Sequence, residues 1–327
     1  MFMDAKALKV LSKIPDFLWL YTLVAMALGL TYPATFKQLA PAITPLLGSV
    51  ILAMGLTLRG SDFMNVFKNP KKALVGILSQ YTVMPLGGFI VAVALLGAVP
   101  EFIAGQVLTG TCPTGVVSNV YTYLSMGNVA LSITLSAINT VIAPILTPTL
   151  TGVLAGKFVP VDVWALFLDM VQVTLIPVTI GVVINTVASK YVAKIKPILP
   201  AYSSFAVATI VAYVAASGQA RILTLTPFMI LLLIVATLIH LFLGYALGYA
   251  YGKAFKLDLP DRITISTETA MQNSGLATVL AIKHWDALAA LPAVTYSIVQ
   301  NVLGPFICQF FRKRVVKTTQ QAKGGKT

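Results

Sequence analysis

Residues 267–289 read TETAMQNSGLATVLAIKHWDALA and place polar and helix-breaking residues inside a segment that is otherwise apolar enough to lie in a membrane. Glu268 stands out, because a charged side chain at the centre of a bilayer costs at least ~3 kcal/mol. Its carboxylate must therefore be neutral, paired or coordinating a cation. No Lys or Arg is predicted at its depth, so a cation from solution is the natural partner. Divalent ions usually recruit several carboxylates, so Na⁺ or H⁺ fits this single carboxylate better.

A second segment of the same kind lies about half a chain earlier, at residues 110–132, which read GTCPTGVVSNVYTYLSMGNVALS. Pro113 and Gly115 remove hydrogen bonds and loosen the helix there, and Asn119 lies 154 residues before Asn273. Unwound backbone is tolerated in a membrane only where protein or a water-filled cavity satisfies its polar groups. The two segments are therefore expected to pack against each other and to line a site.

Side-chain oxygens cluster around the first of these segments. Ser132 and Ser136 are four residues apart and so share one helix face, while Ser118 and Asn119 lie in the broken segment itself. These four oxygens can converge with Glu268. Hard cations prefer such all-oxygen surroundings.

The composition places the chain in a membrane. Hydrophobic residues make up 57% of its 327 residues and charged residues only 10%, whereas soluble domains carry about 25% charged residues. A bilayer core about 30 Å thick requires about 20 apolar residues per helical crossing, and breaks at charges, Pro and Gly predict ten such helices in an all-α integral membrane fold. The predicted helices cover residues 17–32, 42–58, 73–97, 101–126, 128–155, 162–189, 198–217, 225–252, 261–284 and 287–311.

The Lys and Arg residues lie in the short breaks between these helices, which is typical of topology signals rather than of a nucleic-acid surface. With the N-terminus inside, 19 of the 23 fall on the cytoplasmic side, and only Lys37, Lys157, Arg221 and Lys283 fall on the other. We therefore expect a multi-pass membrane protein with both termini in the cytoplasm, and the compact loops favour a bacterial inner membrane.

Each half of the chain holds five predicted helices, and an odd number per half would place the two halves in opposite orientation. Residues 1–156, with a broken helix near 101–126, and residues 160–311, with a broken helix near 261–284, are therefore predicted to be inverted repeats. Residues 312–327 are a basic cytoplasmic tail, which we expect to be disordered.

Five stretches of the sequence resemble the bile acid:sodium symporter family, the relatives of the apical sodium-dependent bile acid transporter. They are AMGLTLRGSDF (53–63), SQYTVMP (79–85), CPTGVVSN (112–119), GNVALS (127–132) and ETAMQNSGLA (268–277). The resemblance extends over essentially all ten predicted helices. It implies a panel domain beside a core domain in which the two broken helices cross, with two sodium ions bound behind the crossing.

The resemblance also implies which residues bind the ions and the substrate. The first sodium ion would be held by Ser118, Asn119, Ser132, Ser136 and Glu268. The second would be held by Gln80, Glu268 and Gln272, with backbone oxygens of Thr269 and Met271. The substrate would meet Thr114, Val116, Asn273, Gln300 and Asn301. Thr114, Val116 and Gln300 depart from the residues common in the family, so the substrate pocket is expected to differ although the ion sites are kept.

Together these features predict a secondary active transporter, not an enzyme, that couples Na⁺ to uptake of a small organic anion by alternating access. Bile acid-like, pantothenate-like and 2-oxo acids all fit, and neither nucleic acid nor an obligate protein partner is expected. The alternative is a proton-coupled antiporter or exporter, with Glu268 carrying H⁺ and Asp169 assisting. Two further alternatives are an arsenite-type exporter that uses Cys112 and an intramembrane hydrolase built on His240.

Overall fold

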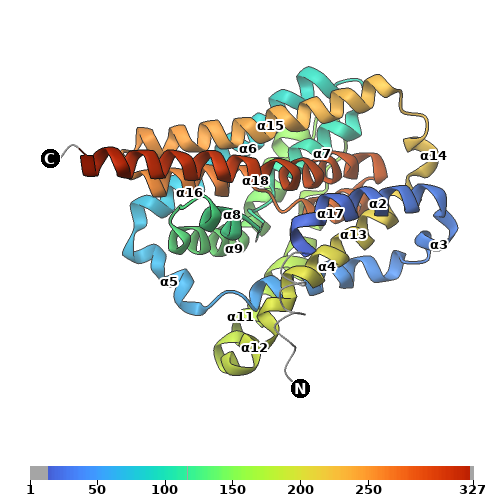
Figure 1. The fold of residues 1–327 in the computed structure, drawn as a ribbon. Coiled ribbons are helices and arrows are strands. Elements are labelled where there is room, and N and C mark those ends of the chain that lie inside the picture. The colour runs from blue at the N-terminus through green and yellow to red at the C-terminus, as the bar shows by residue number, and fades with distance from the viewer. Residues whose placement is uncertain (1–13, 116, 325–327) are drawn as a thin grey trace.

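The computed structural model describes residues 14–115 and 117–324, and within them the chain is a bundle of helices without a strand (Figure 1). Six helical segments are long and apolar enough to cross a membrane. They are α6 (Pro70–Leu96), α9 (Val129–Ala155), Val163–Val187, Ser189–Ser217, α15 (Pro227–Ala254) and the Ala287–Thr318 part of α18 (Ala287–Gly324). The expected all-α membrane fold is confirmed, and the number of ten crossings stays a prediction.

Two of these segments combine several elements. Val163–Val187 is made of α10 (Val163–Met170), a π-helical turn η2 (Val171–Leu175) and α11 (Ile176–Val187), and Ser189–Ser217 is made of α12 (Ser189–Ile195), η3 (Lys196–Ile198) and α13 (Leu199–Ser217). Shorter apolar helices are α2 (Leu18–Thr31) and α4 (Ala40–Gly55). The connecting helices are η1 (Ile14–Phe17), α3 (Pro33–Lys37), α5 (Gly60–Lys68) and α14 (Gln219–Ile222).

Two helices are interrupted, as the sequence predicts. The first consists of α7 (Pro100–Thr111) and α8 (Val117–Leu124), and the second consists of α16 (Leu259–Ala270) and α17 (Ser274–His284). Cys112 adopts extended backbone, which is the conformation that a following proline imposes. At the second break, Asn273 begins α17 by accepting a hydrogen bond from the Leu276 N–H at 3.2 Å.

The two breaks cross and pair through their backbones. The Gly115 N–H donates to the Met271 carbonyl at 3.0 Å, and the Asn273 N–H donates to the Pro113 carbonyl at 2.9 Å. This short antiparallel bridge satisfies backbone groups that the broken helices leave free, as a membrane interior requires. The expectation that the two segments pack against each other is confirmed.

The helices pack in two groups, which Figure 1 shows as a blue and yellow set beside a larger set. In the first group α2 and α4 pack on α13, and α4 packs on α11. In the second group α6, α7, α9, α15, α16 and α18 pack on one another. The largest buried apolar cluster joins the groups and includes Leu47 of α4, Leu108 of α7 and Leu276 of α17.

The C-terminal segment differs from the expectation. We expected disorder from Arg312 onward, but α18 continues to Gly324 as one helix of 38 residues, which ends at the C label in Figure 1. The basic composition was a poor guide here, because Lys, Arg, Gln and Ala are all strong helix formers. A cation–π contact also supports this part of the helix, since the Arg314 guanidinium lies 4.9 Å from the centre of the Tyr249 ring.

Candidate functional site

The Glu268 carboxylate lies behind the crossing and is surrounded by serine hydroxyls. The residue is 2% exposed. The Ser118 hydroxyl donates to its Oε1 at 2.6 Å and the Ser136 hydroxyl donates to its Oε2 at 3.0 Å. Ser132 also bonds to Oε1, and it lies 2.8 Å from the Asn119 amide oxygen. The structure therefore brings together all five residues that the sequence assigns to a first ion site.

Local structure explains this convergence. Ser118 lies in the first turn of α8, immediately after the break. Ser132 and Ser136 lie one turn apart on α9, and Glu268 lies in the last turn of α16. Asn128 begins α9 by accepting a hydrogen bond from the Leu131 N–H at 3.1 Å, which fixes where the serine face starts.

The carbonyl groups at the end of α16 all accept hydrogen bonds from within the protein. The donors come from the other break, from α18 and from the Gln272 side chain. The bonds run from Thr114 Oγ1 to the Glu268 carbonyl (3.0 Å), from Gln272 Nε2 to Thr269 (2.7 Å), from the Tyr296 hydroxyl to Ala270 (2.7 Å) and from the Gly115 N–H to Met271 (3.0 Å). Because each carbonyl oxygen has two lone pairs, each retains one for a further partner.

A second polar cluster lies between α6 and the break before α17. Gln80 is fully buried, and its Nε2 donates to Gln272 Oε1 at 3.0 Å and to the Cys112 carbonyl at 2.9 Å. Gln272 Nε2 lies 3.3 Å from Gln80 Oε1. Among the hydrogen bonds of the described residues, neither amide reaches the Glu268 carboxylate. The residues expected at the second ion site are thus close together, but their amides bond to each other and to backbone rather than to Glu268.

Three of the expected substrate residues, Thr114, Gln300 and Asn301, are buried. Thr114 is fully buried and accepts a hydrogen bond from Asn139 at 3.2 Å. Gln300 brackets the break, since its Oε1 accepts from the Gln272 N–H and its Nε2 donates to the Gln272 carbonyl, each at 3.1 Å. Asn301 is buried and donates to the Ser297 carbonyl at 2.7 Å.

The other two residues expected to bind the substrate are Asn273 and Val116. Asn273 is half-buried and caps α17 as described above. Val116 lies outside the residues that the structure describes. Of the described substrate residues, Asn273 is the most accessible from outside the crossing.

Comparison with known proteins identifies the family. The profile of the sodium bile acid symporter family matches residues 44–226. The "Uncharacterized sodium-dependent transporter YocS" of Bacillus subtilis is 33% identical over 93% of both chains. The "Probable sodium/metabolite cotransporter BASS1, chloroplastic" of Arabidopsis thaliana is 35% identical over 89% of this chain and 72% of its own length.

The chain belongs to the sodium bile acid symporter family. The family resemblance read from the five sequence stretches is therefore confirmed. Members of this family are sodium-dependent transporters, so the expectation that the chain is not an enzyme is confirmed as well.

In this symporter-family chain, His240 is a buried structural residue. Its Nε2 lies 2.9 Å from the Met84 carbonyl and its Nδ1 lies 2.8 Å from Gln106 Nε2. Since a carbonyl can only accept and an amide NH₂ can only donate, the geometry assigns a neutral ring that donates through Nε2 and accepts through Nδ1. Both nitrogens are occupied, which leaves neither one free for proton relay or for activating a nucleophile.

Asp169 also has partners that the sequence left unassigned. Its Oδ1 lies 2.7 Å from the Lys283 ammonium and its Oδ2 lies 2.9 Å from His284 Nε2. Both partners are in the last turn of α17, whereas Asp169 lies at the end of α10. The carboxylate therefore ties the end of an interrupted helix to the segment beside it.

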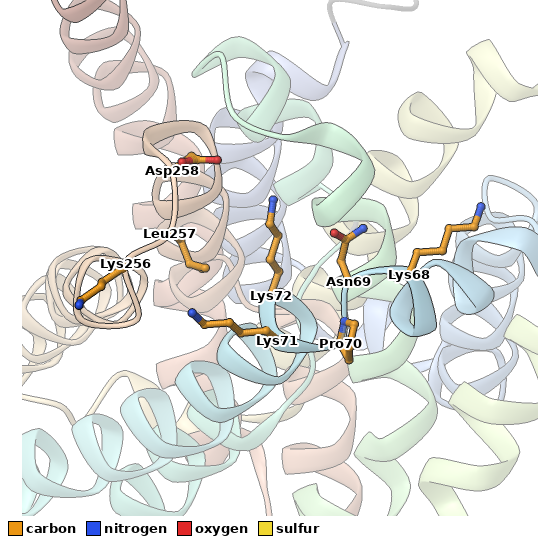
Figure 2. Close-up of a pocket in the computed structure, with 8 residues that line it drawn as sticks. All are labelled: Lys68, Asn69, Pro70, Lys71, Lys72, Lys256, Leu257 and Asp258. Carbon is orange, nitrogen blue, oxygen red and sulfur yellow. The ribbon is translucent and has the colours of Figure 1, made fainter.

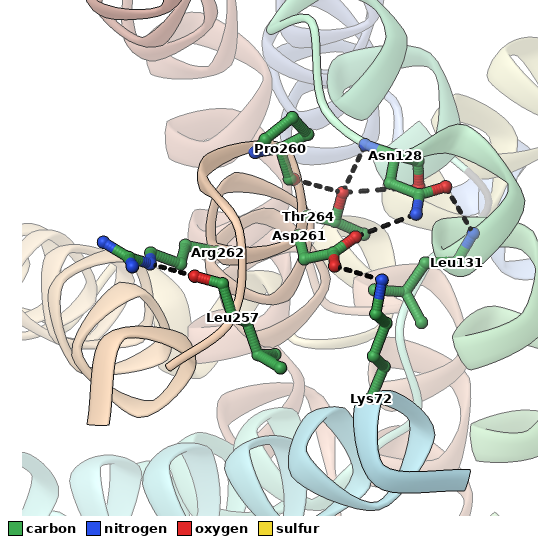
Figure 3. A network of polar contacts seen from close by, with 8 residues as sticks. All are labelled: Lys72, Asn128, Leu131, Leu257, Pro260, Asp261, Arg262 and Thr264. Carbon is green, nitrogen blue, oxygen red and sulfur yellow. Dashed lines mark hydrogen bonds and ion pairs between the residues drawn. The ribbon is translucent and has the colours of Figure 1, made fainter. Parts of the chain in front are cut away.

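The sequence reading missed a buried ion pair at the start of α16 (Figure 3). Asp261 lies near a helix end but is only 2% exposed, and its Oδ2 lies 2.6 Å from the Lys72 ammonium. Its Oδ1 accepts from Asn128 Nδ2 at 2.8 Å. The available signal was spacing, because Asp261 precedes Glu268 by seven residues and so lies on the same helix face.

Beside this ion pair is an open hollow of about 360 Å³ (Figure 2). Lysines dominate its lining, which contains a single carboxylate. The lining residues are Lys68, Asn69, Pro70, Lys71, Lys72, Lys256, Leu257 and Asp258. Lys72 thus belongs both to the wall of the hollow and to the buried ion pair.

Proposed function

We propose that the chain is a secondary active transporter that couples Na⁺ entry to uptake of a small organic anion by alternating access. The observation that carries this proposal is the buried Glu268 carboxylate at the crossing, which receives three serine hydroxyls. Among the described residues it takes part in no ion pair. A carboxylate in such a place needs a cation, and the surrounding oxygens suit a hard one.

The first sodium ion in this proposal is held by Ser118, Asn119, Ser132, Ser136 and Glu268. The serine hydroxyls donate to the carboxylate in this structure, and a hydroxyl can rotate so that its lone pairs face an ion instead. The Asn119 amide oxygen already lies within hydrogen-bond distance of Ser132. Binding would thus require rotation of a few hydroxyl hydrogens and little movement of the backbone.

The second ion is held by Gln80, Glu268 and Gln272 with the carbonyl groups of Thr269 and Met271. This site requires more rearrangement, because the two glutamine amides are bonded to each other. An ion would replace that contact by two amide oxygens. We infer that the second site forms only when the Gln80 and Gln272 side chains separate.

The anion is proposed to bind where the N-termini of α8 and α17 meet at the crossing. Helix N-termini carry partial positive charge and favour carboxylate or sulfonate groups. Asn273, Gln300 and Asn301 would supply amide donors, and Thr114 and Val116 would shape the first break. Bile acid-like, pantothenate-like and 2-oxo acids all have the required charged group.

Alternating access follows from the proposed architecture of ten crossings in two inverted repeats, residues 1–156 and 160–311, with 312–327 as a cytoplasmic tail. The group with the crossing acts as core and the group of α2, α4, α11 and α13 acts as panel. The apolar contact between them permits rocking of one against the other. We place the protein in a bacterial inner membrane with both termini inside.

Thermal unfolding of the detergent-purified protein tests the proposal. At equal ionic strength, NaCl should raise the apparent Tm above its value in KCl, because an ion that binds only the folded state stabilises it. Glu268→Ala should abolish this difference, and the correct anion should add a further increase only with Na⁺ present. Equal Tm values in NaCl and KCl would instead favour the proton-coupled antiporter.

A further inference from the structure

The polar contact between α9 and α16 continues beyond Glu268 toward the start of both helices. Asp261, Thr264 and Glu268 occupy one face of α16 at spacings of three and four residues, and Asn128 and Ser132 occupy the facing side of α9. At 1.5 Å per residue, Asp261 lies about 10 Å along the axis from Glu268. Two carboxylates therefore share one polar seam.

The second carboxylate stands in surroundings rich in oxygen. Asn128 donates to Asp261 through its amide and to Thr264 through its backbone N–H, at 2.8 and 2.7 Å. The Thr264 hydroxyl lies 2.9 Å from the Pro260 carbonyl and 3.3 Å from the Asn128 carbonyl. Figure 3 shows these groups gathered around the Asp261 carboxylate. The cation in this place is the ammonium of Lys72, 2.6 Å from Oδ2.

Gly127 lies between residues of the two clusters. A Cβ on Gly127 would lie 2.9 Å from both Thr122 Cγ2 and Thr264 Oγ1. Thr122 in turn bonds to Ser132, the hydroxyl that reaches Glu268. The glycine thus lets Thr122 and Thr264, one from each cluster, approach each other at this point.

Lys72 is the accessible member of this ion pair. Its side chain is 32% exposed, whereas that of Asp261 is 3% exposed. Lys72 also lines the open hollow, which gives its ammonium space to occupy outside the ion pair (Figure 2). The other lysines of the hollow lower the local concentration of cations and so disfavour return of a released ion.

We propose that the Asp261 carboxylate, the Thr264 hydroxyl and the Asn128 backbone carbonyl form a third cation site, which the Lys72 ammonium occupies at rest, and that a sodium ion leaving Glu268 displaces this ammonium on its way out. The inference rests on the proposed sodium coupling. A tethered ammonium that returns to Asp261 expels the ion, so Lys72 speeds release toward the hollow. Without Lys72, the buried carboxylate loses its partner and is expected to retain a cation from solution.

Equilibrium binding of ²²Na⁺ to the purified protein counts the ions. Lys72→Gln should bind one more sodium ion per chain than wild type. Lys71→Gln is the matched control, because Lys71 lines the same hollow but lies outside the Asp261 pair, and it should bind the wild-type number. Adding Asp261→Asn to Lys72→Gln should return the count to the wild-type number.

The outcomes separate this inference from the proposed function. If wild type binds no Na⁺, the sodium coupling itself is wrong. If wild type binds Na⁺ but Lys72→Gln binds no more, the third site is wrong and the coupling stands. On dilution, Lys72→Gln should release its ions several-fold more slowly than wild type and Lys71→Gln. An extra ion that leaves at the wild-type rate would overturn the displacement step.

Discussion

Glu268 shows how one residue can combine two demands that conflict in a membrane. In the proposed coupling, its carboxylate must be buried to link an ion to the crossing, and it must remain able to carry charge. Three hydroxyl donors stabilise the charged form without providing a fixed counter-charge. A Lys or Arg in their place would pair permanently with the carboxylate and exclude Na⁺.

Ser136→Ala tests this arrangement at a single hydroxyl. The substitution removes an oxygen that lies 3.0 Å from Oε2, so the sodium concentration for half-maximal uptake should rise about 5- to 150-fold, as expected for about 1–3 kcal/mol. Thr134→Val is the matched control on the same helix, because the Thr134 hydroxyl bonds only to the Ala130 carbonyl. An unchanged sodium requirement in Ser136→Ala would remove this residue from the ion site.

Single residues could be predicted from sequence where one strong physical rule applied. The energetic penalty of a charge in the bilayer identified Glu268, and helix periodicity placed Ser132 and Ser136 together. Asp261 escaped this reasoning, because a carboxylate near a helix end is usually solvated, and its burial depends on Lys72 and Asn128 from distant parts of the chain. Contacts of this kind can be identified only once the tertiary structure is known.

Close packing of two helices depends on Gly105. A Cβ at this position of α7 would lie 1.9 Å from the Ala289 carbonyl oxygen on α18. Gly105→Ala should therefore push the helices apart and destabilise the protein by about 1–3 kcal/mol, measured as a lower Tm. In the control Gly48→Ala the nearest atom is 3.9 Å away, so its Tm should be unchanged or slightly higher. Equal Tm values for the two variants would contradict the close contact between α7 and α18.

The ion pairs of Asp169 are predicted to stabilise the contact between α10 and α17 without taking part in transport. Asp169→Asn should lower stability by about 1–3 kcal/mol, near the lower value because Lys283 is 43% exposed. Sodium-dependent uptake per folded molecule should persist, since the carboxylate serves as a link between helices. Asp162→Asn is the control, because Asn caps a helix as well as Asp. Loss of uptake in a stable Asp169→Asn protein would revive its coupling role.

Helix interruptions were predictable from sequence, whereas helix continuation was not. Pro113 and Asn273 act locally, so their positions mark the breaks directly. The packing of the two breaks against each other could also be predicted. Free backbone groups in a membrane must find hydrogen-bond partners, and the two breaks are the only predicted segments at matching depth that leave such groups free. The continuation of α18 past residue 312 is supported by a contact between Arg314 and Tyr249, which lie far apart in the sequence.

At the scale of the whole molecule, the proposed ion sites and the breaks lie in one packing group, while the largest apolar cluster joins that group to the other. The group with the crossing is held together by hydrogen bonds, whereas the boundary between the two groups is mostly apolar. Movement within the group therefore costs more free energy than movement at the boundary. Motion between the groups disturbs mainly nondirectional contacts, together with the ion pairs of Asp169 to Lys283 and His284, whereas motion within the core breaks hydrogen bonds in low dielectric. Rigid rocking is therefore the least costly way to expose the crossing alternately.

Two sodium ions per monovalent anion would move one net positive charge inward in each cycle. That charge gains ~2.3 kcal/mol per 100 mV, and each ion gains ~1.4 kcal/mol per tenfold gradient. With both forces acting, about 5 kcal/mol supports accumulation of about 5000-fold. Uptake into vesicles at a fixed sodium gradient should therefore rise when a potassium diffusion potential makes the interior negative, and vesicles with Glu268→Ala should show no response. Uptake that ignores the potential would indicate one sodium ion per anion, and uptake driven by a pH gradient without sodium would indicate proton coupling.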